Sequence, residues 1–326
     1  MSAAASGQGP EPGPAEPAER IAARRGGDIA VIVNAGAGGG HHGEMLEQLR
    51  ELFRDAGSTA RILAAHSGAD IPRLARQAVQ DGAPIVVAAG GDGTVNCVAA
   101  AVVDSDSALG VLPLGTLNHF AKDLGIPLEL ADAVAVIAAG NVRAVDVGEV
   151  NERIFVNNSS LGLYPHLVRQ REILRTRLGG AKWAAMAGVA LTTLRRSPFL
   201  VVRLRYGEAE QVLHAPLVFI GNNPYVTEGF TIGARERLDA GALGVYVTKR
   251  ETRAGLPGLA LRALFGRLRQ GHDFAAMLAE TVVVETRHSH LAVAADGEVQ
   301  ELKPPLHYRI RRGALRVIAP PAVDEA

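Results

Sequence analysis

The sequence predicts an α/β fold, with a parallel-sheet domain first and a second domain rich in β-strands. In the first half, short apolar runs of strand length alternate with segments of helical periodicity, which is typical of a parallel sheet with helices on both faces. After about residue 142, short β-type runs separated by Gly, Asn and Pro dominate, which indicates an antiparallel sandwich or barrel. The 326 residues are enough for two such cores.

The elements of the first domain follow in a regular order. Residues 1–26 are rich in Ala, Gly, Pro and Glu without apolar periodicity, so a disordered tail is predicted there. The α/β domain is then predicted to span residues 27–142. Its expected strands are residues 28–33, 58–65, 84–89 and 110–113, and its expected helices are residues 44–56, 71–80 and 128–139.

The β-rich domain is predicted to span residues 143–319, with a short tail at 320–326. Its strand-like runs are residues 153–157, 199–206, 211–220, 243–248, 280–285, 307–310 and 315–318. Two helical insertions, residues 167–194 and 256–268, carry many arginines. They are interpreted either as elements that dock on an anionic membrane or as solvated faces of helices covering the β domain.

Composition narrows the class of protein. The 34 Lys and Arg residues balance 34 Asp and Glu residues, so net charge indicates no nucleic-acid partner. A lone cysteine, Cys97, cannot form an intrachain disulfide, which fits a reducing compartment. No secretory signal and no uncharged run of about 18 residues are visible. The sequence therefore predicts a cytoplasmic protein that contacts a membrane only at its surface.

The stretch Gly90-Gly91-Asp92-Gly93-Thr94-Val95-Asn96 follows a buried strand and begins a helix. Its glycines permit tight backbone conformations, and the helix N-terminus offers N–H groups to a phosphate. A second glycine turn, Gly115-Thr116, ends another strand of the same sheet, so the two turns are expected to form one crevice. Asp92 would repel a phosphate unless a cation intervened, which suggests Mg²⁺ or an ordered network; the alternative is a simple N-cap aspartate.

A dinucleotide site of the Rossmann type is not favoured. Gly38-Gly39-Gly40-His41-His42-Gly43 fits the glycine pattern, yet the second strand ends in Ala64-Ala65-His66-Ser67, with no acidic residue for a ribose. No glycine loop ends in the Gly-Lys-Ser/Thr of a P-loop.

Three motifs in order resemble the diacylglycerol kinase catalytic-domain family, which includes bacterial lipid kinases and the sphingosine and ceramide kinases. They are residues 90–96, residues 112–127 (LPLGTLNHFAKDLGIP) and Ala295-Asp296-Gly297-Glu298. The combination is specific, whereas Gly-Gly-Asp-Gly alone also occurs in NAD kinases. The resemblance implies an ATP-dependent kinase that uses Mg²⁺ and phosphorylates a primary hydroxyl of a lipid such as diacylglycerol or a sphingoid alcohol.

The resemblance also implies roles for individual residues. Asp296 would be the base, Glu298 a supporting carboxylate, and Asp92 an organiser of nucleotide and cation. The ATP phosphates would contact Asn34, Gly36, Gly38, Gly90, Gly91, Asp92, Gly93, Thr94, Val95, Asn96, Gly115, Thr116 and Asn118. Without the resemblance, Asp296-Gly297 is predicted to be a hairpin turn.

The chain departs from the family pattern at three places. Ala35 and Ala37 stand in the first loop where Pro and Ser are usual, and His119 and Lys122 replace an acidic and a basic residue. The aspartate expected to bind a structural metal aligns with Ala240, which leaves Asp239 as the remaining candidate ligand. Two alternatives therefore stay open: a non-catalytic nucleotide- or lipid-binding member, and an NAD kinase. The sequence also leaves a homodimer open.

Overall fold

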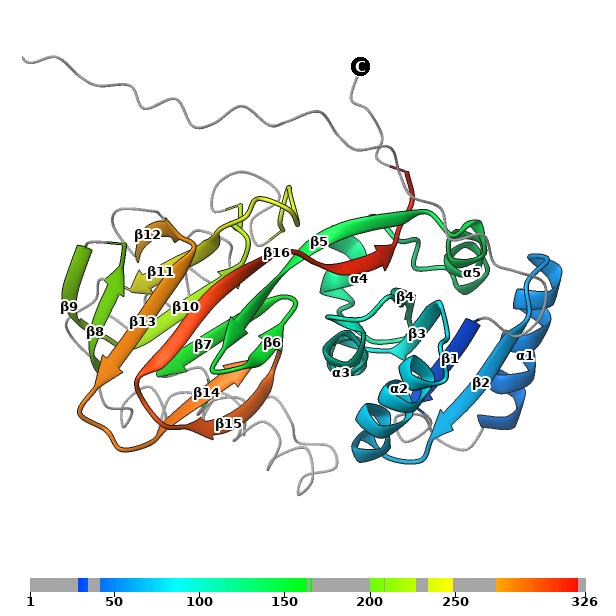
Figure 1. Cartoon of the computed structure of the whole chain (residues 1–326), viewed down its shortest axis with the longest axis horizontal. Helices are drawn as coiled ribbons and strands as arrows, with labels where there is room; N and C mark the ends of the chain where they lie inside the picture. Colours follow the sequence, from blue (N-terminus) through cyan, green and yellow to red (C-terminus); the bar gives the residue numbers. More distant parts are fainter. Residues whose placement is uncertain are drawn as a thin grey trace, which may run out of the picture.

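The computed structural model describes residues 29–34, 42–162, 165, 200–207, 209–226, 234–248 and 274–321 (Figure 1). The predicted tail at 1–26, both arginine-rich insertions and the glycines of the first loop lie outside these ranges. Two packed units are visible, and a long strand pair runs between them (Figure 1). The predicted α/β domain followed by a β domain is confirmed.

A parallel sheet forms the centre of the first unit. β1 (Ile29–Asn34) lies between β2 (Ala60–Ala65) and β3 (Ile85–Gly90), and β4 (Ala108–Pro113) pairs with β3. All residues of β3 and β4 are buried. The apolar sequence of these strands follows from this burial, since helices cover both faces of the sheet.

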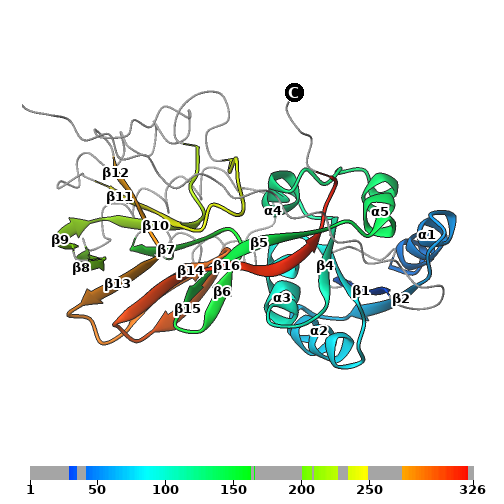
Figure 2. The ribbon, with the colours of Figure 1, turned by 45° about the horizontal axis from the view of Figure 1, so that its top comes forward.

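The helices pack on opposite faces of this sheet (Figure 2). α1 (His42–Asp55) and α5 (Leu130–Ala139) cover one face, while α2 (Ile71–Gln80) and α3 (Asp92–Val102) cover the other. Two short segments complete the unit: the helix α4 (His119–Asp123) after β4 and the 3₁₀ turn η2 (Gly68–Asp70) before α2. α3 and α4 both begin just after strands end, which places their first residues at the same edge of the sheet.

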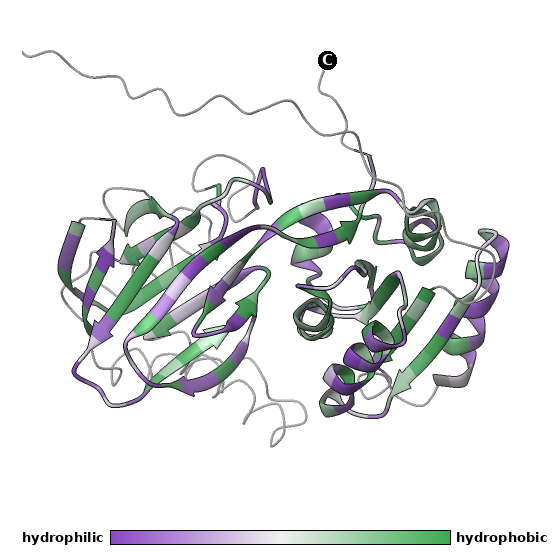
Figure 3. Ribbon diagram, in the orientation of Figure 1, coloured by the Kyte–Doolittle hydropathy of each residue, from purple (hydrophilic) through white to green (hydrophobic). Residues whose placement is uncertain are grey.

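The second unit is a sandwich of antiparallel sheets. One sheet consists of β12 (Phe274–Ala279), β11 (Leu243–Thr248), β10 (Leu217–Asn222), β7 (Asn158–Gly162), β14 (Leu291–Ala295) and β15 (Glu298–Leu302), in that order. The facing layer contains β13 (Thr281–Thr286), β8 (Leu200–Tyr206), β9 (Ala209–Ala215) and β6 (Arg153–Phe155). Inward side chains such as Val218 and Val284 form a common core. On β8, buried and exposed residues alternate, and Figure 3 shows this as bands of contrasting hydropathy.

β5 (Val142–Val150) and β16 (Leu306–Ile318) join the two units. They pair with each other, and β16 also pairs with β13 in the sandwich and with β4 through Val317 opposite Leu109. Backbone pairing is therefore continuous from β2 to β9. The pair is irregular between Arg311 and Leu315, where Gly313 has a φ of 56°.

Some boundaries differ from the sequence prediction. The run 211–220 forms two strands, β9 and β10, because Pro216 between them has no N–H to donate. The runs 307–310 and 315–318 are parts of the single strand β16. The boundary predicted at residue 142 falls at the start of β5, whose Val145 and Val147 still pack in the first core.

Candidate functional site

The turn from β3 into α3 is built on close contact. A Cβ on Gly90 would overlap the side chain of Thr94, so only glycine fits there. The Asn34 Nδ2 donates to Thr94 Oγ1 at 3.4 Å, which links the end of β1 to the same turn. The first N–H groups of α3 have no partner within the helix and point toward the carboxyl edge of the sheet. Local geometry thus suits the predicted phosphate site.

The second glycine turn touches the first, backbone against backbone. A Cβ on Gly115 would lie 2.5 Å from the Cα of Gly91 and 2.7 Å from Asn118 Oδ1. The Leu114 N–H donates to the Gly90 carbonyl at 3.1 Å. The structure therefore brings together the two turns that the sequence placed in one crevice.

Asn118 shapes this second turn from within. It is buried, has a φ of 52°, and its Oδ1 accepts the Gly115 N–H at 3.0 Å. Its Nδ2 donates to the carbonyls of Pro113 and Gly115. Thr116 beside it is exposed. The Asn118 side chain thus holds the turn, and any ligand would meet the backbone and Thr116.

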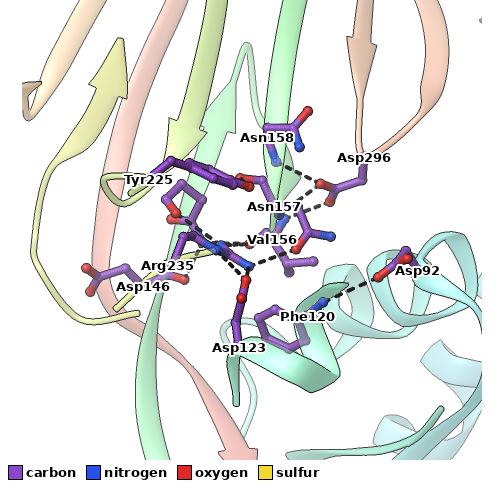
Figure 4. Close-up of polar contacts among 11 residues, drawn as sticks. Asp92, Phe120, Asp123, Asp146, Val156, Asn157, Asn158, Tyr225, Arg235 and Asp296 are labelled. Atoms are coloured by element: carbon purple, nitrogen blue, oxygen red, sulfur yellow. Dashed lines mark hydrogen bonds and ion pairs between the residues drawn. The ribbon is translucent and has the colours of Figure 1, made fainter. Parts of the chain in front are cut away.

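Asp92 connects α3 to α4. Its Oδ1 accepts the Phe120 N–H at 3.4 Å (Figure 4). The contact is long for a hydrogen bond to a carboxylate, so among the described residues much of the acceptor capacity of Asp92 is unused. Its position at the first residue of α3 also satisfies the N-terminal preference for acidic side chains.

Asp296 sits in the tight turn between β14 and β15. Asp296 and Gly297 have φ values of 46° and 84°, so the predicted hairpin is present. Although the residue is partly exposed at the turn, its carboxylate points inward (Figure 4). Oδ2 accepts the N–H of Val156 at 2.7 Å, and Oδ1 accepts those of Asn157 at 2.8 Å and Asn158 at 3.0 Å.

Burial raises the pKa of Asp296 to about 6, against the opposing effect of the three backbone donors and of the positive charge of Arg235. A carboxylate offers about four acceptor positions, and the backbone uses three. The group therefore keeps the capacity to accept a proton near neutral pH.

A cavity of about 390 Å³ lies between the α2–α3 face and the sandwich. Asn96 of α3 lines one wall, and Ala295, Glu298 and Gln300 of the β14–β15 hairpin line the facing wall. The buried oxygens Asn96 Oδ1 and Gln300 Oε1 have no hydrogen-bond partner. The body of α3 and the β14–β15 hairpin thus border one cavity, which contains polar groups that a ligand could satisfy. Neither Asp296 nor the turn residues 90–95 line this cavity.

Arg235 is a site feature that sequence analysis did not identify. Its side chain is completely buried, and it forms an ion pair with Asp123 at the end of α4, 2.7 Å from Nη2 to Oδ2. It also donates to the Val156 carbonyl at 2.6 Å and to Asn157 Oδ1 at 2.8 Å (Figure 4). No local sequence pattern predicts the pair of Arg235 and Asp123, because the two residues are 112 positions apart in the chain.

The residues around Asp239 do not fit a metal centre. The Asp239 carboxylate is exposed and bonds Arg237 at 3.0 Å. Ala240 contributes no side-chain oxygen, and the next N–H, of Gly241, donates to buried Asp146 at 2.7 Å. Within the described part of the chain, no three His, Cys, Asp or Glu side chains gather as a metal would require. Gly36 and Gly38, predicted to contact phosphate, lie outside the described residues.

Comparison with known proteins agrees with this architecture. Residues 28–150 match the model of the diacylglycerol kinase catalytic domain, and residues 161–319 match that of the YegS C-terminal NAD kinase beta sandwich-like domain. A probable lipid kinase YegS-like protein of Chromohalobacter salexigens is 31% identical over 234 residues, which cover 69% of this chain and 72% of that protein. The chain belongs to the YegS-like family of probable lipid kinases. The predicted family is confirmed.

The alignments to other relatives cover a smaller part of this chain. The probable lipid kinase YegS of Escherichia fergusonii is 37% identical over 158 residues, 46% of this chain and 53% of that protein. The alignment thus spans about half the length of this curated relative. A crystal structure described as a diacylglycerol kinase of Bacillus anthracis has a TM-score of 0.66 at 22% identity, with 90% of this chain and 97% of that chain covered. This likeness supports the fold. None of the helices that the structure describes is long and apolar enough to cross a bilayer.

Proposed function

We propose that this YegS-like protein is an ATP-dependent lipid kinase that transfers the γ-phosphoryl group to a primary hydroxyl of a lipid, such as diacylglycerol or a sphingoid alcohol. One observation carries the proposal: polar contacts link Asp296 through Asn157 and Arg235 to Asp123 of α4, and the Phe120 N–H of α4 donates to Asp92 at the glycine turn (Figure 4). Phosphoryl transfer requires a phosphate cradle and a proton acceptor that are held in fixed relative positions. Family membership supports the same reaction.

The nucleotide would bind through the backbone of the two touching turns. The N–H groups at residues 92–94 and that of Thr116 would hold phosphate oxygens. Mg²⁺ accompanying ATP would supply charge neutralisation, and the free acceptor positions of Asp92 fit that ion.

Asp296 would accept the proton of the lipid hydroxyl. With a pKa of about 6, it is mostly ionised at neutral pH and still basic enough to take up a proton in the transition state. Glu298 lines the cavity on the same hairpin and would support the acceptor. Binding and proton transfer are thus divided between the two units.

The acceptor would come from a membrane surface. Leu114 and Leu117, in the turn after β4, have exposed fractions of 37% and 51%. Such apolar side chains beside the phosphate turn fit contact with acyl chains. We place the protein in the cytoplasm, with transient docking at the inner membrane face, because its substrate resides there.

Two departures support a second candidate, a non-catalytic nucleotide- or lipid-binding protein. Ala240 removes a family metal ligand, and His119 replaces an acidic residue and is exposed. Such a protein would bind ATP and lipid without turnover. An NAD kinase would instead phosphorylate soluble NAD.

A panel assay separates these functions. The full chain is incubated with labelled ATP and Mg²⁺ and with micelles of diacylglycerol, sphingosine, ceramide or phosphatidylglycerol, or with soluble NAD. A labelled lipid that Asp296→Asn fails to form, while Glu210→Gln on exposed β9 forms it normally, supports the kinase. Tight ATP binding with no labelled product from any acceptor supports the non-catalytic alternative. Labelled NAD would identify an NAD kinase.

A further inference from the structure

The guanidinium group of Arg235 uses its whole hydrogen-bonding capacity inside the protein. Its five N–H groups face five oxygen contacts at 2.6–3.0 Å. These oxygens belong to the Asp123 carboxylate, the Asn157 side chain, and the carbonyls of Val156 and Asn222. A buried guanidinium is costly unless it is paired and fully hydrogen-bonded, and here both conditions hold.

Arg235 and Asp296 hold the same segment from two sides. The Asp296 carboxylate accepts the N–H groups of Val156, Asn157 and Asn158. Arg235 binds the carbonyl of Val156 and the side chain of Asn157. In the peptide group between Val156 and Asn157, the carbonyl accepts from Arg235 and the N–H donates to Asp296. The two charges polarise this peptide group in the same sense, which strengthens both hydrogen bonds.

The acceptors of Arg235 form the kind of oxygen set that surrounds a hard cation. Two carbonyls, a side-chain amide and a carboxylate are the ligands that Ca²⁺ or Mg²⁺ prefers. The neighbouring loop around Asp239 lacks such a set, as described above. The guanidinium of Arg235 therefore supplies a fixed positive charge among these oxygens.

We propose that Arg235 is a positioning residue whose guanidinium replaces a structural metal ion, locking residues 156–158, and with them Asp296, to Asp123 of the first unit. The consequence for catalysis rests on the proposed kinase function; the structural consequence does not. Because Asp123 ends α4 and α4 also contacts Asp92 through Phe120, the same link sets the position of Asp296 relative to the phosphate turn.

The first experiment is independent of turnover. Arg235→Gln and the matched control Arg237→Gln, two residues away but exposed and bonded only to Asp239 in the structure, are compared with the wild type. Hydrogen exchange of peptides covering residues 153–160 is measured, with β3 as an internal reference. Because Arg235→Gln removes a buried charged partner, these peptides should exchange about tenfold faster than in the wild type. In Arg237→Gln their exchange rate should equal that of the wild type. Unchanged exchange at 153–160 in Arg235→Gln would overturn the proposal.

Arg235→Lys provides a second variant in case Arg235→Gln does not fold. It keeps the charge, yet a single ammonium group has three donors and cannot bind all four oxygens that Arg235 contacts, so an intermediate exchange rate is expected. Thermal unfolding of the wild type with and without EDTA, in the absence of ATP, is measured alongside elemental analysis. No tightly bound metal and an unchanged Tm are expected. A Tm that EDTA lowers and Mg²⁺ restores would show that a metal, and not Arg235, supplies the cation.

If the kinase is active, kinetics add a separate outcome. Arg235→Lys is expected to lower kcat about tenfold while leaving KM for ATP within about twofold, because Asp296 is displaced and the phosphate turn is intact. An equal loss in Arg237→Gln, or an effect confined to KM, would contradict the positioning role. Absence of turnover in the wild type would refute the proposed function and leave the exchange and EDTA results to decide the structural proposal.

Discussion

Gly91 and Gly115 lie in direct backbone contact, so that a Cβ on Gly115 would be 2.5 Å from the Cα of Gly91. The first belongs to the turn after β3 and the second to the turn after β4. Their contact brings two sets of backbone N–H groups to one place. A phosphate chain bound there could receive hydrogen bonds from both turns without any cationic side chain.

Gly115→Ala is expected to damage both stability and ATP binding. The added methyl group would collide with backbone, and overpacking of this kind costs about 1–3 kcal/mol. Chemical denaturation and calorimetric titration with ATP measure the two effects. Wild-type stability with wild-type ATP affinity would show that the two turns separate easily and do not act together.

Gly93→Ala should change the stability of the protein and its affinity for ATP in opposite directions. Gly93 is in the first turn of α3, and a Cβ there meets no atom within 4 Å. Alanine favours a helix over glycine by about 1 kcal/mol, so the free protein should become more stable. If phosphate lies against this backbone, ATP binding should weaken nonetheless. An increase in Tm with unchanged ATP affinity would place the phosphates elsewhere.

Asp146→Asn is expected to destabilise the junction between the units. Asp146 is 2% exposed, and its carboxylate accepts the N–H of Gly241 at 2.7 Å and of Gly313 at 2.8 Å. An amide has one oxygen, so one buried N–H would face an NH₂ group at a cost of about 1–3 kcal/mol. Asp239→Asn, an exposed residue on the loop that contains Gly241, should change the unfolding free energy by less than about 0.5 kcal/mol. Equal effects in urea denaturation would contradict this account.

The raised pKa of Asp296 predicts two pH effects of definite sign. As a base, it must be ionised, so kcat/KM should rise with pH through about 6. The contribution of Asp296 to the free energy of unfolding changes in the opposite direction and falls as pH rises. The pKa of Asp296 in the folded protein lies above the ordinary aspartate value of 3.8, so its contribution to stability is present below pH 3.8 and is lost as pH rises to about 6.

The difference in unfolding free energy between wild type and Asp296→Asn measures this contribution. Arg235 is the charged group that acts on the carboxyl, with Tyr225 also near, and both remain in the variant. The difference should fall between about pH 4 and pH 6 and then level off. A difference that rises over this interval would mean that the backbone donors and Arg235 outweigh burial, and that the pKa is lowered.

Cys97 provides a probe of the cavity. Burial, with a further effect of the Glu298 charge, raises the pKa of its thiol to about 11, so at pH 8 only about one thiol in a thousand is ionised. Alkylation should therefore be slow, and ATP should slow it further if the nucleotide enters the cavity that Cys97 lines. The single cysteine makes mass spectrometry unambiguous. Rapid labelling that ATP does not affect would place the nucleotide outside this cavity.

Much of the fold could be predicted because its signals are local. Continuous apolar runs such as residues 84–89 indicate strands buried on both faces, and glycine after a strand indicates a tight turn. Asp296-Gly297 is a hairpin because both residues tolerate positive φ. These preferences depend on neighbours within a few positions, so the sequence itself determined the α/β unit, the β unit and the positions of the turns.

The tertiary structure decided how those parts act together. The hairpin prediction could not reveal that the Asp296 carboxylate turns inward to three N–H groups some 140 residues earlier in the chain. Nor could any local pattern pair Arg235 with Asp123 or continue one sheet through β16. Such contacts arise only when distant segments pack and buried polar groups must find partners, because an unpaired buried charge would cost more than the fold gains elsewhere.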